Sequence, residues 1–88
     1  MIIRFEFDPE KSAANSDKHG IDFVQAKAIW GDVDYIEIPL KAADEIRFMV
    51  IGMIEGKLWS GIITYRVESV RIISARRSRK EEIAIYES

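Results

Sequence analysis

The first residues of the chain alternate between apolar and polar side chains. Over residues 2–7 this period of two predicts a short, half-buried strand. Asp8 and Pro9 follow, and these residue types favour the N-cap and the first turn of a helix. We expect that helix to run to about Lys18 and to stop at Gly20, which adopts a left-handed conformation without strain.

A second helix is predicted from a capping pattern and a helical apolar stripe. Asp22 precedes the stripe, and Gln25 stands three residues later, as in a capping box. The helix should end at Gly31 and Asp32. Its stripe, which we expect to face the core, consists of Phe23, Ala26, Ile29 and Trp30.

Four strands are then predicted, at residues 33–40, 46–54, 57–66 and 70–77. Pro39 confines the first of them to an edge of the sheet, or ends it. The second is apolar on both faces, which is typical of a central strand that is covered on both sides. Glu55 and Gly56 have the character of a tight hairpin turn, and residues 67–69 turn the chain again.

The last helix is predicted from Ser78 and Glu81, which have the spacing of a capping box. The order of elements is therefore β-α-α-β-β-β-β-α. A meander of antiparallel strands packed under helices is an α+β fold. The 88 residues fit a single domain that spans residues 1–88.

The charges of the chain are distributed unevenly. The formal net charge is −2, but residues 64–80 hold six basic residues and one acidic residue, a local charge of +5. The other 71 residues hold seven basic and fourteen acidic residues, a charge of −7. A basic patch on an acidic protein indicates an anion site, with RNA phosphate as the first candidate. A solvated strand end beside a charged helix surface is the alternative interpretation.

The composition disfavours several classes of protein. The chain has no cysteine, which removes disulfide and thiolate chemistry and suits a reducing cytoplasm. No apolar run approaches the ~20 residues that span a bilayer, and the first residues lack the pattern of a signal peptide. No metal site is expected, because no cluster of ligand residues accompanies the one histidine. No cofactor-binding motif is present, so no cofactor is expected.

His19 is the only histidine, and it follows Lys18 at the predicted end of the first helix. Histidine suits proton transfer near neutral pH, and the neighbouring lysine could bind an anion. The alternative is structural: a residue in this position also satisfies the last carbonyl groups of a helix and its dipole.

Arginine offers a planar fork that binds phosphate through two hydrogen bonds. If the hairpin closes through residues 67–69, Arg66 and Arg76 can lie near the same sheet surface, where the two forks could hold a phosphodiester and stabilise charge on it. Arg47 lies on the neighbouring predicted strand. Arg47 could contact phosphate as well, or it could instead form an ion pair with Glu45 or Glu37.

Three aromatic residues have both structural and functional interpretations. Tyr86, late in the last helix, could stack on a base or donate its hydroxyl group, or it could anchor the helix to the sheet. Trp30 and Trp59 are expected in the core or facing a partner.

Residues 5–23, which read FEFDPEKSAANSDKHGIDF, resemble the opening of the BrnT family. Further matches are EIR at 45–47, IG at 51–52, TYR at 64–66, RIISARR at 71–77, and Glu82 followed by Tyr86 and Glu87. The combination of DPxKxxxNxxKHG with RIISAR is specific, and the matches extend over nearly the whole chain.

BrnT proteins are ribonuclease toxins of bacterial type II toxin–antitoxin pairs. The resemblance implies a RelE-like fold, cytoplasmic cleavage of RNA, and a BrnA-type antitoxin that carries a DNA-binding domain, in a possible heterotetramer. The chain departs from the family where Ile83 and Ala84 follow Glu82, because basic residues are usual there, and where Arg79 replaces the usual Thr. Its acidic balance predicts weaker non-specific RNA affinity.

The function that we expect is metal-independent cleavage of RNA, in which a 2′-hydroxyl group attacks the adjacent phosphate. His19, assisted by Lys18, would do the acid–base work, Arg66 and Arg76 would stabilise the phosphate, and Tyr86 would position a base or act as a second acid. Further contacts to RNA are expected from Arg47, Arg77, Arg79 and Lys80. The alternative is a non-catalytic module of the same fold that binds RNA or the antitoxin.

Overall fold

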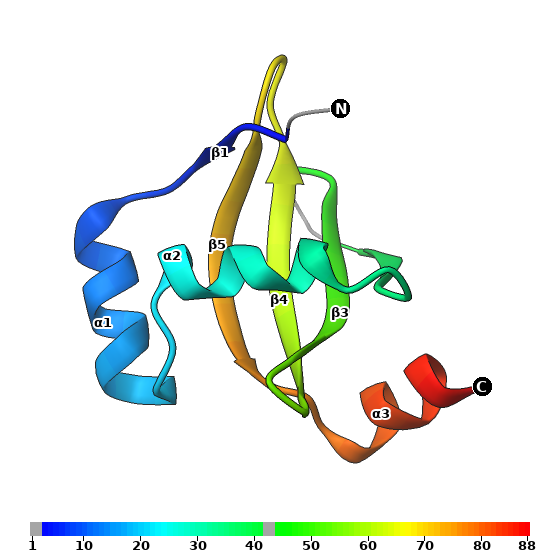
Figure 1. The fold of residues 1–88 in the computed structure, drawn as a ribbon. Coiled ribbons are helices and arrows are strands. Elements are labelled where there is room, and N and C mark those ends of the chain that lie inside the picture. Colours follow the sequence, from blue (N-terminus) through cyan, green and yellow to red (C-terminus); the bar gives the residue numbers. More distant parts are fainter. Residues whose placement is uncertain (1–2, 42–43) are drawn as a thin grey trace.

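A computed structural model describes residues 3–41 and 44–88 of the chain (Figure 1). Its elements are β1 (Phe5–Glu6), α1 (Pro9–His19), α2 (Phe23–Ala26), the 3₁₀ helix η1 (Lys27–Gly31), β2 (Ile36–Leu40), β3 (Arg47–Ile54), β4 (Lys57–Tyr65), β5 (Val70–Arg77) and α3 (Lys80–Glu87). The predicted α+β class and order of elements are confirmed, with η1 continuing the second helix. In the described part of the chain, no helix is long and apolar enough to cross a membrane.

The five strands form one sheet in the order β1-β5-β4-β3-β2. The strands from β2 to β5 are antiparallel neighbours, which confirms the predicted antiparallel meander, and β1 is added to its edge in parallel with β5. From β1 the chain passes through the helices to β2, at the opposite edge of the sheet. The meander from β2 to β5 then returns across the sheet, so that β5 lies beside β1. Pro39 lies on β2, an edge strand, as predicted.

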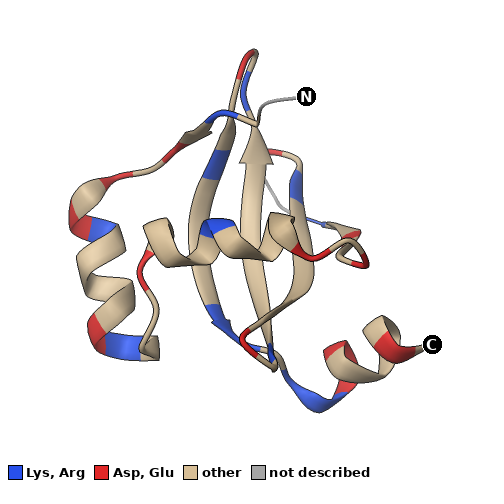
Figure 2. Ribbon diagram, in the orientation of Figure 1, with Lys and Arg blue, Asp and Glu red and all other residues tan. Residues whose placement is uncertain are grey.

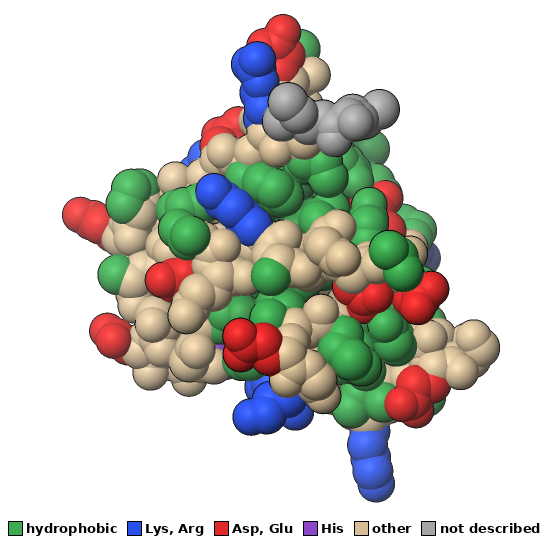
Figure 3. All heavy atoms as spheres, in the orientation of Figure 1, with side chains coloured by type: hydrophobic (Ala, Val, Ile, Leu, Met, Phe, Trp, Pro, Cys, Tyr) green, Lys and Arg blue, Asp and Glu red, His purple; other side chains and the backbone are tan. Residues whose placement is uncertain are grey.

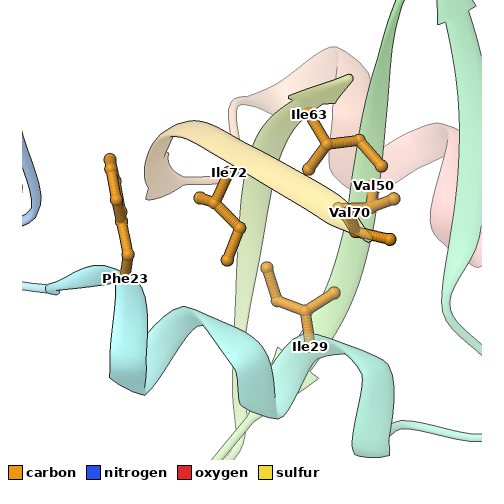
Figure 4. Close-up of a cluster of buried hydrophobic side chains, with 6 residues drawn as sticks. All are labelled: Phe23, Ile29, Val50, Ile63, Val70 and Ile72. Atoms are coloured by element: carbon orange, nitrogen blue, oxygen red, sulfur yellow. The ribbon is translucent and has the colours of Figure 1, made fainter. Parts of the chain in front are cut away.

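The core lies between the sheet and the helices α1, α2 and η1, which cover one face of it (Figure 1). Phe23 and Ile29 reach from the helical layer toward Val50, Ile63 and the side chains of β5 (Figure 4). Each of the six residues in this cluster is at most 7% exposed. Burying side chains of this size stabilises the fold by roughly 1.5–3 kcal/mol each.

Buried polar side chains fix α1 to the sheet. The Asn15 amide group donates to the carbonyl oxygens of Ile21 (2.7 Å) and Ala75 (2.8 Å), and its oxygen accepts from the Ala75 N–H (3.3 Å). Ser12, one turn earlier, accepts from the Phe23 N–H at 2.9 Å. Helix α1 is therefore joined to β5 and to the start of α2 through directional bonds.

The local signals for helix and turn ends are confirmed. Asp8 accepts from the Glu10 N–H (2.8 Å), and Gly20 ends α1 with φ at 77°. Asp22 and Gln25 form the predicted reciprocal capping box. Between β3 and β4, both residues of the two-residue turn have positive φ (49° and 80°), the backbone that favours a tight hairpin.

The predicted start of the last helix was wrong by one residue. Helix α3 has Arg79 in the N-cap position, and the Glu82 carboxylate accepts from the Arg79 N–H at 2.9 Å. Ser78 is instead hydrogen-bonded to Ser60 at 2.8 Å. The other differences are at strand ends: the strands from β1 to β4 are all shorter than predicted, and residue 2, the first of the first predicted strand, lies outside the described residues.

Gly52 on β3 is expected to be intolerant of any side chain. A Cβ atom there would lie 2.9 Å from both Cγ2 and the backbone oxygen of Ile29, so the structure around it would have to shift. We expect Gly52→Ala to lower the free energy of unfolding by about 1–3 kcal/mol, as overpacking does. Gly31→Ala, where nothing lies within 4 Å, is the matched control and should change it by less than about 0.5 kcal/mol. Similar urea-unfolding midpoints for the two variants would contradict this account.

Candidate functional site

The predicted site residues are divided between two ends of the sheet. Lysine and arginine gather where α1 and β5 finish and where α3 begins (Figure 2). We call this the basic end, and its members are Lys18, His19, Lys57, Arg76, Arg77, Arg79 and Lys80. Arg47 and Arg66 lie at the opposite end, where β3 begins and β4 finishes.

Arg66 and Arg76 do not share a surface, contrary to the prediction. The Arg66 N–H bonds to the Ser69 carbonyl oxygen at one end of the β4–β5 hairpin, whereas Arg76 lies opposite Ser60 near the other end. Val70 and Arg76 are six residues apart, which corresponds to about 20 Å along a strand. Two arginine side chains cannot hold one phosphate across that distance.

His19 is placed at the basic end by the docking of α1. Asn15 binds Ala75, and α1 and β5 lie side by side and finish at the same end (Figure 1). His19 is four residues after Asn15, so it lies on the same helix face one turn further on. Arg77 is two residues after Ala75, so it lies on the same face of the sheet. His19 and Arg77 therefore lie at the same end of the molecule, and so does the exposed Lys18.

Arg76 is occupied by a carboxylate from α3. Its two terminal nitrogens bind the two Glu82 oxygens at 2.8 and 2.7 Å, and Ser60 donates to the same carboxylate at 2.8 Å. The hydrogen bonds from Arg76 are the largest influence on Glu82 and help lower its pKa to about 2, although burial opposes them. The pKa of Arg76 is raised, first by its hydrogen bonds to Glu82. In this arrangement both branches of the arginine fork are already used.

Tyr86 holds the other end of α3. Its hydroxyl group donates to the Asp32 carboxylate at 2.6 Å, and the same carboxylate oxygen accepts from the Met53 N–H at 2.8 Å. The hydrogen bond to Asp32 is the main influence that raises the pKa of Tyr86 to about 12, and it lowers the pKa of Asp32. The hydroxyl group thus stays protonated at neutral pH and anchors the helix.

The arginines at the opposite end are mostly paired with carboxylates. Arg47 binds Glu45 at 3.1 Å, one of the two partners expected for it, and Arg71 binds Glu6 at 2.8 Å. The Arg66 side chain is exposed, and none of the hydrogen bonds or ion pairs found within residues 3–41 and 44–88 involves it. Arg66 is therefore accessible to a ligand, but at a place remote from His19.

A pocket of about 410 Å³ opens beside His19. We call it the Trp59 pocket, and it is lined by Gly20, Ile21, Gln25, Ala28, Ile54, Glu55, Lys57 and Trp59. The Arg77 guanidinium lies over the Trp59 ring, 5.5 Å from its centroid. The space-filling view shows basic side chains at this lower end of the molecule, below an apolar surface (Figure 3).

Sequence reasoning did not identify Trp59, Lys57 or Gln25 as site residues. Trp59 lies opposite Arg77 in the pairing of β4 with β5, and this register depends on a bulge between Ile62 and Ile63. The only available signal was a large aromatic residue in a strand that precedes the basic stretch. That signal is equally typical of a core residue.

The basic end combines one imidazole with several cationic side chains on a small α+β sheet. A basic surface of this kind attracts polyanions, and an imidazole is a side chain suited to proton transfer. In the part of the chain that the structure describes, no three histidine, cysteine or acidic side chains are grouped so as to hold a metal ion.

Residues 7–82 match the family described as ribonuclease toxin, BrnT, of type II toxin–antitoxin systems. The chain belongs to this family, as the resemblance predicted, and its fold agrees with the RelE-like architecture. No curated protein matches the chain closely. The family match covers α1, the strands β2 to β5 and the first residues of α3, so it includes both partners of the Arg76–Glu82 pair.

The Arg76–Glu82 pair is expected to control the acid stability of the fold. The pKa of Glu82 falls from about 4.5 when unfolded to about 2 when folded, so its stabilisation is complete above pH 4.5 and is lost as the pH falls toward 2. Glu82→Gln should therefore lower the free energy of unfolding by about 3 kcal/mol at pH 7 and by much less near pH 2.

Urea unfolding of the parent and of the variant across this pH range would measure the effect. Glu81→Gln removes the same charge from an exposed neighbour and should be nearly neutral. Equal losses in both variants, or a loss from Glu82→Gln that does not depend on pH, would contradict the assignment.

Proposed function

We propose that this protein is the toxin of its pair and cleaves RNA without a metal ion, with the reaction centred on His19 at the basic end. The observation that carries the proposal is that α1 and β5, far apart in sequence, bring His19, Lys18 and Arg77 to one end of the sheet. Family membership supplies the ribonuclease activity. The arrangement supports a site where a phosphodiester and a proton-transfer group meet.

In the proposed reaction, the 2′-oxygen of one nucleotide attacks the adjacent phosphorus. The imidazole of His19 takes the proton from this hydroxyl group while the new P–O2′ bond forms. The P–O5′ bond then breaks, and the imidazolium of His19 gives its proton to the departing 5′-oxygen, which restores the neutral imidazole. The products are a 2′,3′-cyclic phosphate and a 5′-hydroxyl end, and no oxidant or reductant is required.

The cationic residues receive distinct roles in this proposal. Lys18 and Arg77 bind the reacting phosphate and stabilise the charge that grows on it. Arg79 and Lys80 contact neighbouring phosphates from the start of α3. Arg76 and Tyr86 act as positioning residues, because they hold α3 through Glu82 and Asp32. Arg66 and Arg47 contact RNA only beyond the reacting nucleotide.

The proposed partner is a BrnA-type antitoxin with a DNA-binding domain, which neutralises the toxin in the cytoplasm and forms a heterotetramer with it. Membership of a type II toxin family supports an antitoxin in general. The specific antitoxin type and the stoichiometry are proposals that come from the family resemblance.

A non-catalytic binding module is the second candidate, and the occupied fork of Arg76 favours it. An arginine bound to Glu82 through both branches offers less to a phosphate than a free one does. Binding of RNA without product fragments, in the presence and absence of translating ribosomes, would support this candidate over the enzyme.

Purified protein in EDTA is expected to cut RNA into fragments with 5′-hydroxyl ends. His19→Ala should slow the cleavage at least about 100-fold, because it removes the proton-transfer group. Lys18→Ala should also slow it, whereas Lys11→Ala, an exposed lysine earlier on the same helix, is the matched control. A His19→Ala protein that cuts at the parent rate would remove the proposed role of this residue.

The separation of the two ends predicts that the effect of an arginine depends on substrate length. On a dinucleotide substrate, Arg77→Ala should slow cleavage by roughly 10- to 100-fold, and Arg66→Ala should have almost no effect, since a dinucleotide cannot span about 20 Å. On a longer RNA, Arg66→Ala should weaken binding. It should also reduce the slope of log K against log[salt] by the amount that corresponds to about one phosphate contact.

Arg4→Ala provides the control for simple loss of charge, since Arg4 is exposed and lies at the same end of the sheet as Arg66. If Arg66→Ala and Arg77→Ala impaired dinucleotide cleavage equally, the placement of the reaction at the basic end would be wrong.

A further inference from the structure

The Trp59 pocket lies immediately beside the residue to which the proton transfer is assigned. Gly20, the residue after His19, forms part of its wall, and Ile21 continues that wall. The other walls come from the start of α2 and η1 and from the β3–β4 hairpin. A nucleotide whose phosphate lies at His19 would therefore have its base within reach of this pocket.

Trp59 gives the pocket an aromatic surface that is held in place. The buried Ile21 and Ala75 belong to the apolar cluster against which Trp59 packs, and Ile54 packs there too. Arg77 lies over the ring but does not line the pocket. Trp59 thus contributes an aromatic ring to the pocket wall, with a guanidinium group close to it.

The lining of the pocket combines apolar residues with three polar ones, Gln25, Glu55 and Lys57. Gln25 accepts from the Asp22 N–H through its side-chain oxygen at 2.9 Å, so its NH₂ group is left to donate. Glu55 and Lys57 place an acceptor and a donor of opposite charge on the hairpin side. An apolar surface with a few polar groups at its edge is the usual form of a small-ligand site.

We propose that the Trp59 pocket is a nucleobase subsite. The base of the nucleotide next to the cleaved phosphate stacks on Trp59, and Gln25, Glu55 and Lys57 make hydrogen bonds to the edge of that base. Stacking on aromatic side chains is the common way in which proteins bind unpaired bases. The inference rests on the proposed function, because it takes single-stranded RNA as the ligand and His19 as the cleavage position.

Trp59 supplies its own signal for the test. The chain has two tryptophans, and Trp30 is packed edge-on against Phe5 (4.8 Å between ring centroids) and lies away from the pocket. In a Trp30→Phe protein, the remaining emission reports on Trp59. The probe is a short 2′-O-methyl oligoribonucleotide, which has bases and phosphates but lacks the attacking hydroxyl group, so binding is measured without cleavage.

The oligonucleotide is expected to quench Trp59 emission with the same dissociation constant that fluorescence anisotropy of a labelled probe gives. An abasic oligonucleotide of equal length should bind more weakly and quench little. A Trp59→Phe protein, which keeps only Trp30, is the matched control and should show clearly less quenching than the Trp30→Phe protein, because Trp30 lines a separate pocket with Arg66. These readings isolate the contact between base and indole from the phosphate contacts.

Substitution provides a second measurement. Trp59→Ala should raise the dissociation constant for the oligonucleotide by roughly 5- to 150-fold, the loss of one base–aromatic stack. Trp59→Phe keeps an aromatic face and should raise it by less than about 5-fold. Circular dichroism and the urea midpoint would show whether the alanine variant is folded. If it is not, the Trp59 quenching in the Trp30→Phe protein decides the question.

The outcomes separate this inference from the proposed function. RNA binding and cleavage without quenching of Trp59 would overturn the subsite and leave the ribonuclease intact. Quenching by RNA without any cleavage would support the subsite and favour the binding module. If neither the oligonucleotide nor natural RNA binds or is cut, both proposals fail.

Discussion

Asn15 makes the interaction on which the arrangement of this protein depends. Its amide group joins α1 to the last core strand and to the loop that begins α2, and it does so in a place that excludes water. A buried amide is costly unless all its bonds are made, so α1 has one position in which Asn15 is satisfied. That position also places His19 at the same end of the molecule as Arg77. The asparagine of the DPxKxxxNxxKHG pattern is therefore the structural support for the histidine of the same pattern.

The Arg76–Glu82 pair has the corresponding role for α3. The helix has few apolar contacts with the sheet, and it is held by charged and polar groups at both of its ends. Breaking a buried pair leaves one charge uncompensated, which costs more than the pair contributes when intact. The same two residues thus set the direction of α3 and keep Arg79 and Lys80 at the basic end. Arg76 therefore has a structural role in this protein, because it holds α3 against the sheet through Glu82.

The sequence was sufficient for features that depend on neighbouring residues. The caps at Asp8 and Asp22, the stop at Gly20 and the Glu55–Gly56 turn follow from local chemistry, and each was predicted. Features that depend on distant pairing were missed. The parallel position of β1, the distance between Arg66 and Arg76, and the contact of Trp59 with Arg77 all follow from strand register. Helix α3 begins late because Glu82 has a partner outside the helix, which a local capping pattern does not reveal.

The pairing of β1 with β5 has a consequence for the timing of folding during synthesis. Phe5 pairs with Val70, and Asn15 bonds to Ala75, so the first elements made have no place to dock until residues 70–77 have left the ribosome. Contacts of such long sequence separation form late, and translation adds only about 5–20 residues per second. His19 and Arg77 therefore reach the same end of the molecule only after nearly the whole chain has emerged. During synthesis the proposed site stays unassembled until the last strand of the sheet is available.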